Sequence, residues 1–223
     1  MPECGPTGIL GGTFDPVHYA HLRLAQEACD ALSLSRVVWI PAGQPPHRAQ
    51  PRTPAAQRLE MTRLAIAHNP AFLVDDAEVR ADRPSYTVPT LERLRAAPAA
   101  TLSLVLLLGV DAFLALDTWH RWRELFDLAH IAVANRPGYP LRAQDMAPPL
   151  AAEFEARHRP DPLAVRETAA GSVVQFEMTP LAISATAIRA LLGAGRSARY
   201  LLPDPVLDYI HRNHLYSAAL HGR

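Results

Sequence analysis

The sequence predicts an α/β fold in which a doubly wound parallel sheet carries helices on both faces. The 223 residues are 49% hydrophobic, which is enough for one substantial core. Apolar runs typical of buried strands alternate along the chain with segments whose apolar residues recur at helical spacing. Such alternation favours a parallel sheet, because a parallel pair of strands needs a crossover connection that is usually a helix.

The first unit of this alternation lies at the N-terminus. A short apolar run at residues 8–10 stops at a pair of glycines, and residues 22–32 then show helical spacing. We expect a strand, a glycine turn and a helix, with Asp15 as the helix N-cap and Pro16 as its first residue, since both residue types are favoured there.

The remaining elements follow in the same order. Thr53 and Pro54 are typical of an N-cap and a first helical residue, so a second helix is expected from there to about residue 69. We expect further strands at residues 37–42, 71–79, 102–109, 130–138 and 173–178, and further helices at residues 88–96, 120–129, from about 184, and 204–216. Residues 141–171 lack a clear period and indicate a surface excursion or a small insertion. We therefore expect one domain over residues 1–223, with a small C-terminal helical part from about residue 184.

Composition excludes several classes of function. The formal net charge is zero, with 22 acidic and 22 basic residues, so no overall field attracts nucleic acid or an anionic membrane. Every basic residue is an arginine, which excludes a P-loop lysine and Schiff-base chemistry. Cys4 and Cys29 lack metal or disulfide spacing, and no targeting or membrane-spanning segment is evident. These features predict a cytoplasmic protein.

The glycine turn carries the first candidate site. Gly11 and Gly12 would let a ligand approach the backbone, and His18 and His21 would share one face of the helix start, where unpaired N–H groups attract anions. Three alternatives remain open. The pair of histidines could be a coincidence beside an ordinary turn. A zinc site would lack ligands, and a dinucleotide-binding turn would need the absent GxGxxG pattern.

A second polar cluster lies in the C-terminal half. Ser184 and Thr186 stand at a predicted helix start, with Arg189 one turn later and an apolar stripe on the opposite face. Alone, this pattern equally describes an N-cap followed by a solvated arginine. Two such clusters in one chain favour a pair of anion-binding sites.

These residues resemble a known family. The segments GGTFDPVHYAHL (11–22) and ISATAIR (183–189) resemble the HxGH and ISSTxxR motifs of the nucleotidyltransferase superfamily. The segments that follow one branch of it, the bacterial nicotinate-nucleotide adenylyltransferases, are PAGQPPHR (41–48), RPSYT (83–87), LLGVDAFLALDTWHRW (107–122), NRPGY (135–139) and LLPDPVLDYI (201–210). These segments occur in the same order as in the family and are spread over nearly the whole chain, so the protein is identified as a member of that family.

The resemblance implies a Rossmann-like fold and the transfer of AMP from ATP to nicotinate mononucleotide, with Mg²⁺ accompanying ATP and no protein side chain assigned as a metal ligand. It implies catalytic roles for His18, His21 and Arg189. It implies ATP contacts from Gly11, Gly12, Thr13, Phe14, Gly109, Asp111, Ser184 and Thr186, and mononucleotide contacts from His47, Arg48, Thr87, Trp119 and Arg136.

Ala20 departs from the family pattern, which has glycine between the two histidines. Alanine adds one methyl group and is favoured over glycine inside a helix by about 1 kcal/mol, so we expect it to be tolerated.

Other functions remain as alternatives to the one that the resemblance implies. The same chemistry could act on nicotinamide mononucleotide or another phosphate monoester. A regulatory protein that only binds nucleotide, and a nucleic-acid-binding module, are less consistent with the intact motifs and the neutral charge. We expect no nucleic-acid or membrane partner, and the sequence leaves open whether the chain forms a homo-oligomer.

Overall fold

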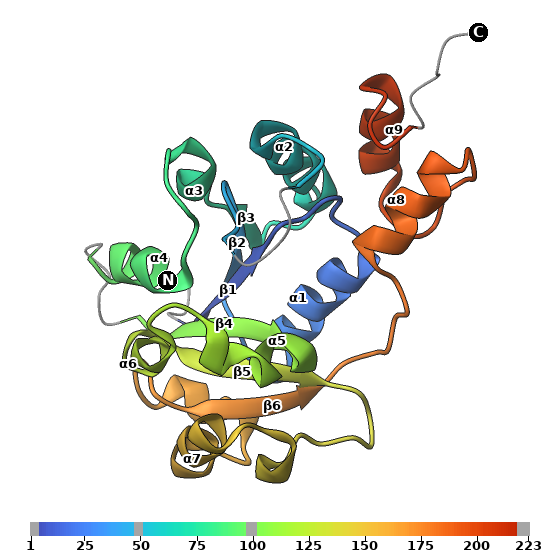
Figure 1. Cartoon of the computed structure of the whole chain (residues 1–223). Coiled ribbons are helices and arrows are strands. Elements are labelled where there is room, and N and C mark those ends of the chain that lie inside the picture. The colour runs from blue at the N-terminus through green and yellow to red at the C-terminus, as the bar shows by residue number, and fades with distance from the viewer. Residues whose placement is uncertain (1–4, 47–50, 97–101, 218–223) are drawn as a thin grey trace, which may run out of the picture.

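The structure is a computed structural model that describes residues 5–46, 51–96 and 102–217. Its sheet has six parallel strands in the order β3-β2-β1-β4-β5-β6 (Figure 1). The strands are β1 (Thr7–Gly12), β2 (Arg36–Pro41), β3 (Phe72–Val74), β4 (Leu104–Gly109), β5 (His130–Asn135) and β6 (Val173–Glu177). The chain winds outward from β1 in one direction and from β4 in the other. The doubly wound parallel sheet is therefore confirmed.

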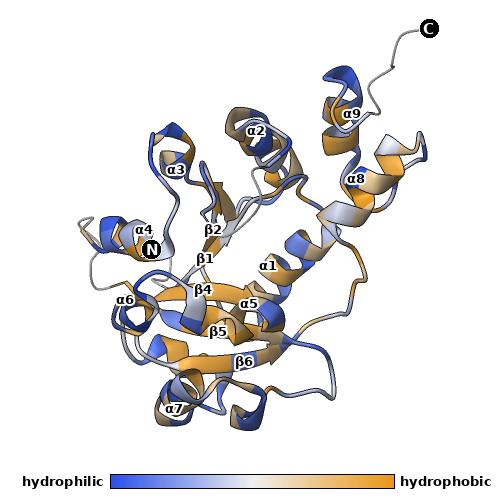
Figure 2. Ribbon diagram, viewed as in Figure 1, coloured by the Kyte–Doolittle hydropathy of each residue, from blue (hydrophilic) through white to orange (hydrophobic). Residues whose placement is uncertain are grey.

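Helices cover both faces of this sheet. One apolar cluster joins the sheet to α1 (Tyr19–Leu32), α2 (Ala55–Ile66), α8 (Ala185–Gly193) and α9 (Asp204–Arg212). The other joins it to α4 (Thr87–Arg95), α5 (Val110–Leu114), α6 (Leu125–Leu128) and α7 (Pro148–Arg157). Alternate residues of strand β4 contribute to the two clusters, since Val105 and Leu107 belong to the first and Leu106 to the second. Apolar strands accordingly lie inside and polar helix surfaces outside (Figure 2).

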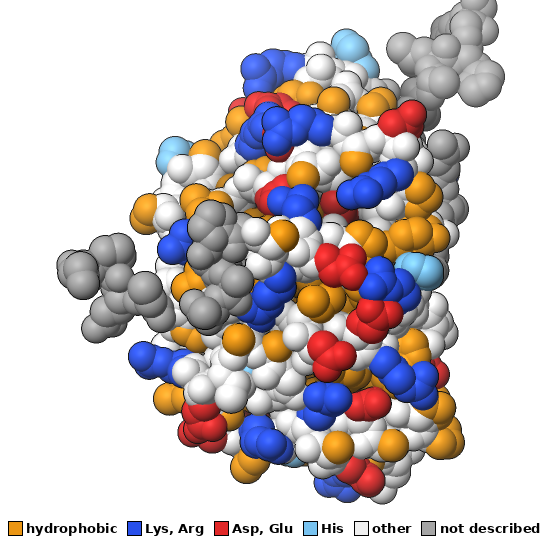
Figure 3. Space-filling view, turned by 90° about the vertical axis from the view of Figure 1, so that its left-hand side faces the viewer, with side chains coloured by type: hydrophobic (Ala, Val, Ile, Leu, Met, Phe, Trp, Pro, Cys, Tyr) orange, Lys and Arg blue, Asp and Glu red, His pale blue; other side chains and the backbone are white. Residues whose placement is uncertain are grey.

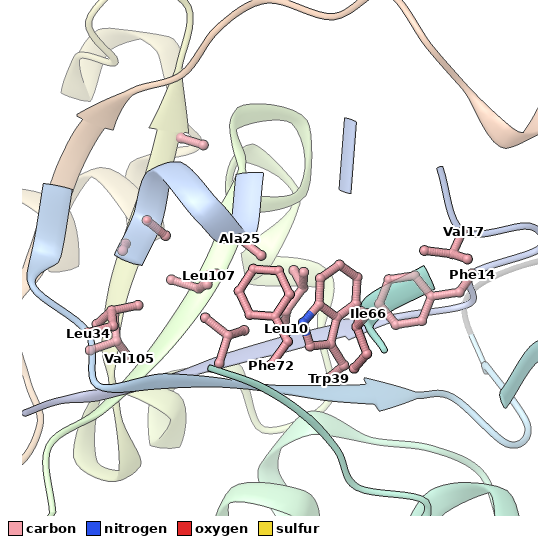
Figure 4. Close-up of a cluster of buried hydrophobic side chains, with 14 of the residues drawn as sticks. Leu10, Phe14, Val17, Ala25, Leu34, Trp39, Ile66, Phe72, Val105 and Leu107 are labelled. Atoms are coloured by element: carbon pink, nitrogen blue, oxygen red, sulfur yellow. The ribbon is translucent and has the colours of Figure 1, made fainter. Parts of the chain in front are cut away.

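An aromatic row in the first cluster fixes the segment that follows β1. Phe14, Trp39 and Phe72 lie side by side (Figure 4), with ring centroids 5.4 Å apart for the first pair and 5.6 Å for the second. Phe14 is only 3% exposed, although it lies in a loop and has a φ of 49°. Burial of an aromatic side chain stabilises by about 1.5–3 kcal/mol, which offsets the cost of a left-handed backbone there.

The first helix begins later than the sequence suggests. Its N-cap is His18 and its first residue is Tyr19, so the expected N-cap at Asp15 is wrong. The carboxylate of Asp15 instead accepts hydrogen bonds from the backbone N–H of Arg52 and the hydroxyl of Tyr216. Because its carboxylate oxygens accept from residues far away in the sequence, Asp15 does not cap the helix that follows it.

Other boundaries also differ from expectation. Helix α2 begins at Ala55 with Pro54 as its N-cap and ends at Ile66, so the expected N-cap at Thr53 is wrong. The third strand is only three residues long, because the side chain of Asp75 accepts from the N–H of Ala77 and starts the short helix α3 (Ala77–Arg80). The expected helix over residues 120–129 is a 3₁₀ turn followed by α6. The last helix ends at Arg212, and His214 then adopts a φ of 51° that breaks the helix.

Residues 141–171 contain more structure than their sequence pattern indicates. Helix α7 has a proline as its first residue, where proline is favoured. It buries Leu150 and Phe154 in the second cluster, so this segment helps to cover one face of the sheet. Within the described ranges, none of the helices has the length and apolar character needed to cross a bilayer.

Surface charge is mixed in sign. The face that carries α3, α4 and α6 shows acidic and basic side chains interspersed (Figure 3). Arg93 pairs with Asp75 at 2.6 Å and Arg121 with Glu92 at 2.6 Å on exposed parts of these elements. Exposed pairs of this kind contribute little to stability, but they leave no broad field of one sign over this face.

Candidate active site

The strand order predicts a ligand site at the carboxyl ends of β1 and β4. These two strands are neighbours, yet their crossovers leave in opposite directions, which is the switch point where α/β sheets bind ligands. Gly11 and Gly12 end β1, and Gly109 ends β4. A Cβ added to Gly11 or Gly109 would meet no atom within 4 Å, so both glycines face open space.

Gly12 is required for a different reason. A Cβ at this position would lie 2.8 Å from the ring of Phe14, which is too close for a side chain of any size. The glycine pair therefore does two separate jobs. Gly11 leaves room for a ligand, whereas Gly12 leaves room for the aromatic ring that anchors the following residues, 13–18, here called the β1–α1 loop.

His18 and His21 lie together at the end of this loop. Their rings stack with centroids 3.8 Å apart, and the Nδ1 atom of His21 accepts a hydrogen bond from the backbone N–H of His18 at 3.3 Å. His18 is only 5% exposed, and burial lowers its pKa to about 4, so it is neutral at pH 7. Its Nδ1 atom is buried without a hydrogen-bond partner among the described residues, which is uncommon for a polar atom in a folded protein.

The N-terminus of α1 is only partly available to an anion. The backbone N–H of Tyr19 donates to the carbonyl oxygen of Leu201 at 3.1 Å, so the turn between α8 and α9 closes one side of the helix start. The two imidazoles, rather than a full set of helix N–H groups, are therefore the groups that α1 offers to a ligand.

The second predicted cluster joins the first. Ser184 caps α8 as expected, with its Oγ accepting from the N–H of Ala187 at 3.1 Å. Arg189 donates from Nη1 to the carbonyl oxygen of Asp15 at 2.7 Å and from Nη2 to Oγ1 of Thr186 at 3.3 Å. Helix α8 is thus bonded directly to the β1–α1 loop across 174 residues of sequence. The structure brings both polar clusters to one place.

Two residues that the sequence did not single out complete this region. Tyr216 donates its hydroxyl proton to Oδ1 of Asp15 at 2.6 Å, and burial and that carboxylate raise its pKa well above the ordinary value. Arg58, in α2, is 1% exposed and donates to the carbonyl oxygen of Thr13. Neither has a local signal, because a tyrosine near the chain end and an arginine in a helix are ordinary sequence features.

The described residues predicted for the mononucleotide lie on a more open surface, together with Asp111 from the set predicted for ATP. Thr87 begins α4, and Trp119 is half-buried beyond β4, where it packs against the second apolar cluster. Asp111, in the first turn of α5, and Arg136, after β5, are both exposed. His47 and Arg48 lie outside the described residues, so their predicted role stays a prediction.

Two of the family-like segments pack against each other beside this surface. Oγ of Ser85 accepts from the backbone N–H of Gly43 at 2.9 Å, and the N–H of Ser85 donates to the carbonyl oxygen of Gln44 at 2.9 Å. A Cβ on Gly43 would lie 2.1 Å from the carbonyl oxygen of Glu78, so only glycine fits there. The segments PAGQ (41–44) and PSYT (84–87), the second of which ends at Thr87, are therefore held together by hydrogen bonds.

A cavity of about 550 Å³ lies elsewhere, between α1, the end of α2 and Tyr200. Leu22, Phe72 and Ile183 contribute to its lining, which includes neither histidine of the motif. It is separate from the candidate site. Within the part of the chain that the structure describes, no three His, Cys, Asp or Glu side chains group closely enough to hold a metal ion.

Comparison with known proteins gives matches over most of the chain. A family model described as cytidylyltransferase-like matches residues 9–191. The chain is 57% identical over 211 residues to the probable nicotinate-nucleotide adenylyltransferase of Dechloromonas aromatica, covering 95% of this chain and 97% of that protein. It is 48% identical to the probable nicotinate-nucleotide adenylyltransferase of Acidithiobacillus ferrooxidans, covering 94% of this chain and 95% of that protein.

Solved structures show the same fold. The nicotinic acid mononucleotide adenylyltransferase of Plasmodium falciparum complexed with NaAD has a TM-score of 0.71 at 14% identity, and covers 95% of this chain and 97% of its own. At this identity the likeness concerns the fold alone. It supports the Rossmann-like arrangement of sheet and helices described above.

Proposed function

Because the chain belongs to the nicotinate-nucleotide adenylyltransferase family, we propose that it transfers the AMP group of ATP to nicotinate mononucleotide, giving nicotinate adenine dinucleotide and pyrophosphate in NAD biosynthesis. The single observation that carries this proposal is the bond from Arg189 to the carbonyl oxygen of Asp15. It unites two groups of anion-binding side chains at the predicted ligand site of the sheet. A nucleoside triphosphate needs such a combined site.

The reaction requires positioning rather than a protein nucleophile. A phosphate oxygen of the mononucleotide attacks the α-phosphorus of ATP, and the bond from that phosphorus to the bridging oxygen of the β-phosphate breaks. Pyrophosphate leaves with the electron pair. The site offers imidazoles and a guanidinium in place of an activated Ser, Cys or Lys, which suits phosphoryl-type transfer by charge stabilisation.

His18 and His21 are assigned to the α-phosphate and to the charge that develops on it. Both rings stand at the start of α1, at the end of the β1–α1 loop that begins directly after Gly11 and Gly12. The buried Nδ1 of His18 lacks a partner among the described residues, and a neighbouring polyphosphate would raise the pKa of this imidazole from about 4. A bound anion would thereby favour the protonated, donating form of His18.

Arg189, Ser184 and Thr186 are assigned to the β- and γ-phosphates. Arg189 already holds the β1–α1 loop, so the leaving pyrophosphate would lie between α8 and that loop. The planar guanidinium suits a phosphate through paired N–H donors. Mg²⁺ would enter as the Mg–ATP substrate complex and neutralise part of the phosphate charge.

Gly109 and Asp111 are assigned to adenosine, and Trp119 and Thr87 to nicotinate. Gly109 faces open space, and the exposed carboxylate of Asp111 can accept from a ribose hydroxyl. Trp119 offers a half-buried ring for stacking on the pyridine. The N-terminus of α4 at Thr87 would favour the carboxylate of nicotinate over a neutral amide. His47, Arg48 and Arg136 are assigned to mononucleotide phosphate on resemblance alone.

We also propose one nucleotidyltransferase domain and a cytoplasmic location. Helices α8 and α9 contribute to the same apolar cluster as α1, which supports one domain that includes the C-terminal helical part. The Cys29 thiol is half-buried and its pKa is raised to about 11, so it is poorly reactive. Oligomeric state and the expected absence of nucleic-acid partners stay predictions.

A direct assay tests the proposed function. The purified protein is incubated with Mg–ATP and either nicotinate mononucleotide or nicotinamide mononucleotide, while pyrophosphate is followed and the product is identified by mass. We expect the nicotinate dinucleotide to form preferentially. Greater activity with nicotinamide mononucleotide would assign the chain to that acceptor, and equal activity would show that the enzyme does not discriminate between the two. Formation of neither dinucleotide would overturn the proposal in favour of another phosphate monoester or a protein that only binds nucleotide.

A further inference from the structure

Arg58 is a charged side chain of α2 that is almost completely buried, with 1% of its surface exposed. Its guanidinium donates only to backbone carbonyl oxygens in the hydrogen bonds described for it. The Nε atom donates to Thr53 at 3.1 Å, Nη1 to Thr13 at 2.7 Å and to Ala42 at 2.7 Å, and Nη2 to Gly43 at 3.0 Å. One side chain thus joins the β1–α1 loop, the segment after β2 and the start of α2.

This placement is costly unless the guanidinium is well satisfied. Burial of a charged group carries a penalty of several kcal/mol that hydrogen bonds must offset. Arg63, one and a half turns further along the same helix, shows the ordinary alternative, since it is half exposed and pairs with Glu60 and Asp76. Near Arg58 the acidic side chain is that of Asp15, whose own oxygens accept from Arg52 and Tyr216.

The position of the carbonyl oxygens that accept from Arg58 indicates the role of its buried guanidinium. Thr13 and Ala42 follow directly on β1 and β2, at the sheet edge that faces the proposed ATP phosphates. Carbonyl oxygens at the carboxyl end of a parallel sheet carry partial negative charge, and they would repel a polyphosphate if they turned toward it. Arg58 donates hydrogen bonds to these oxygens and adds a positive charge next to them.

We propose that Arg58 is a positioning residue of the phosphate site, which holds the carbonyl oxygens of Thr13 and Ala42 away from the ligand and so strengthens binding of the ATP phosphates. This inference rests on the proposed function, because it takes ATP as the ligand. Arg58 acts through the β1–α1 loop, and no direct contact with the substrate is needed.

The test compares a ligand with phosphates and one without. Wild type, Arg58→Met, Arg58→Lys and the control Arg63→Met are titrated calorimetrically with Mg–ATP and with adenosine. We expect Arg58→Met to raise the Kd of ATP by about tenfold or more, as for loss of several charge-assisted bonds, and to leave that of adenosine within about twofold. Arg63→Met should match wild type. Arg58→Lys keeps the charge but cannot span four carbonyls, so its ATP affinity should fall between the two.

A purely structural role predicts a different pattern. Irreversible unfolding of part of the sample lowers the stoichiometry for both ligands and leaves both Kd values unchanged, whereas reversible unfolding raises both apparent Kd values by the same factor. If Arg58→Met binds neither ligand, the Arg58→Lys variant is the test. A selective loss of ATP affinity in Arg58→Lys supports the proposal, and an equal loss of affinity for ATP and adenosine overturns it. Unchanged ATP affinity in folded Arg58 variants overturns this inference alone. A wild-type protein that fails to bind ATP overturns the proposed function as well.

Discussion

The two halves of the candidate site are built differently. The β1–α1 loop, on the phosphate side, is held by Arg58, Arg189 and Tyr216, which come from three helices or their flanks. On the other side, Asp111 and Arg136 are exposed and Trp119 is half-buried at the ends of β4 and β5. The phosphate half is preorganised by bonds to its backbone, whereas the nucleoside and pyridine half offers side chains on an open surface.

This difference fits the role that is proposed for each half. Transfer of a phosphoryl-type group depends on donors fixed within fractions of an ångström, and bonds to loop carbonyls fix them before the substrate arrives. Recognition of a ring by stacking tolerates small adjustments, because stacking depends weakly on position. Substitution of the histidines in the phosphate half should therefore affect turnover. Substitution of Arg58, which positions the loop, should affect ATP affinity, and substitutions in the open half should affect affinity for the ring that each residue contacts.

The largest effect is expected at the two histidines. His18→Ala and His21→Ala should each lower kcat by about 10²-fold or more, the range for loss of one preorganised donor to a developing charge. Steady-state rates of pyrophosphate release measure the effect, and substitution of the exposed His211 in α9 by alanine is the control. Full activity in either variant would remove the phosphate half from the mechanism.

A second effect concerns stability against pH. The pKa of His18 is about 4 in the folded protein and near 6.5 unfolded, so the unfolded state binds more protons between these values and folding weakens as pH falls through that window. From pH 7.5 to 5 this group should remove about 2 kcal/mol of unfolding free energy. Urea unfolding of wild type and His18→Gln measures the difference in pH dependence, in which the contributions of other histidines cancel. Identical pH profiles would show that His18 is not buried in its neutral form.

A smaller effect is expected in the open half. Trp119→Ala should raise the KM of nicotinate mononucleotide by about tenfold, as loss of one stacking contact predicts, and should spare the KM of ATP. Initial rates at varied concentrations of each substrate separate the two constants. Selective loss of ATP affinity instead would move Trp119 to the nucleoside end of the site.

The smallest effect is expected at Ala20, the second residue of α1. Ala20→Gly should change ATP affinity and turnover by less than about tenfold, since the methyl group is small and alanine favours the helix by about 1 kcal/mol. An increase of more than about tenfold in ATP affinity or in turnover would mean that the methyl group of Ala20 crowds the nucleotide. Thermal unfolding of the same variant reports the loss of helix stability.

Local patterns predicted the elements of this fold well. Glycines that end β1 and β4, alternating apolar runs and the Ser184 cap depend on neighbouring residues, and all three are confirmed. The residues that hold the phosphate half could not be predicted in this way. Tyr216 and Asp15 are 201 residues apart, and Arg58 reaches Thr13 across 45. The local pattern around Asp15 predicts a helix cap, whereas its actual partners, Arg52 and Tyr216, are distant in the sequence.

The stereochemical course of the reaction tests most directly the claim that this preorganised site acts without a protein nucleophile. The enzyme would be given one diastereomer of ATP carrying sulfur on the α-phosphorus, together with nicotinate mononucleotide, and the configuration of the dinucleotide product would be determined. A single in-line displacement predicts inversion at phosphorus. Retention would reveal a covalent AMP–protein intermediate and contradict the account.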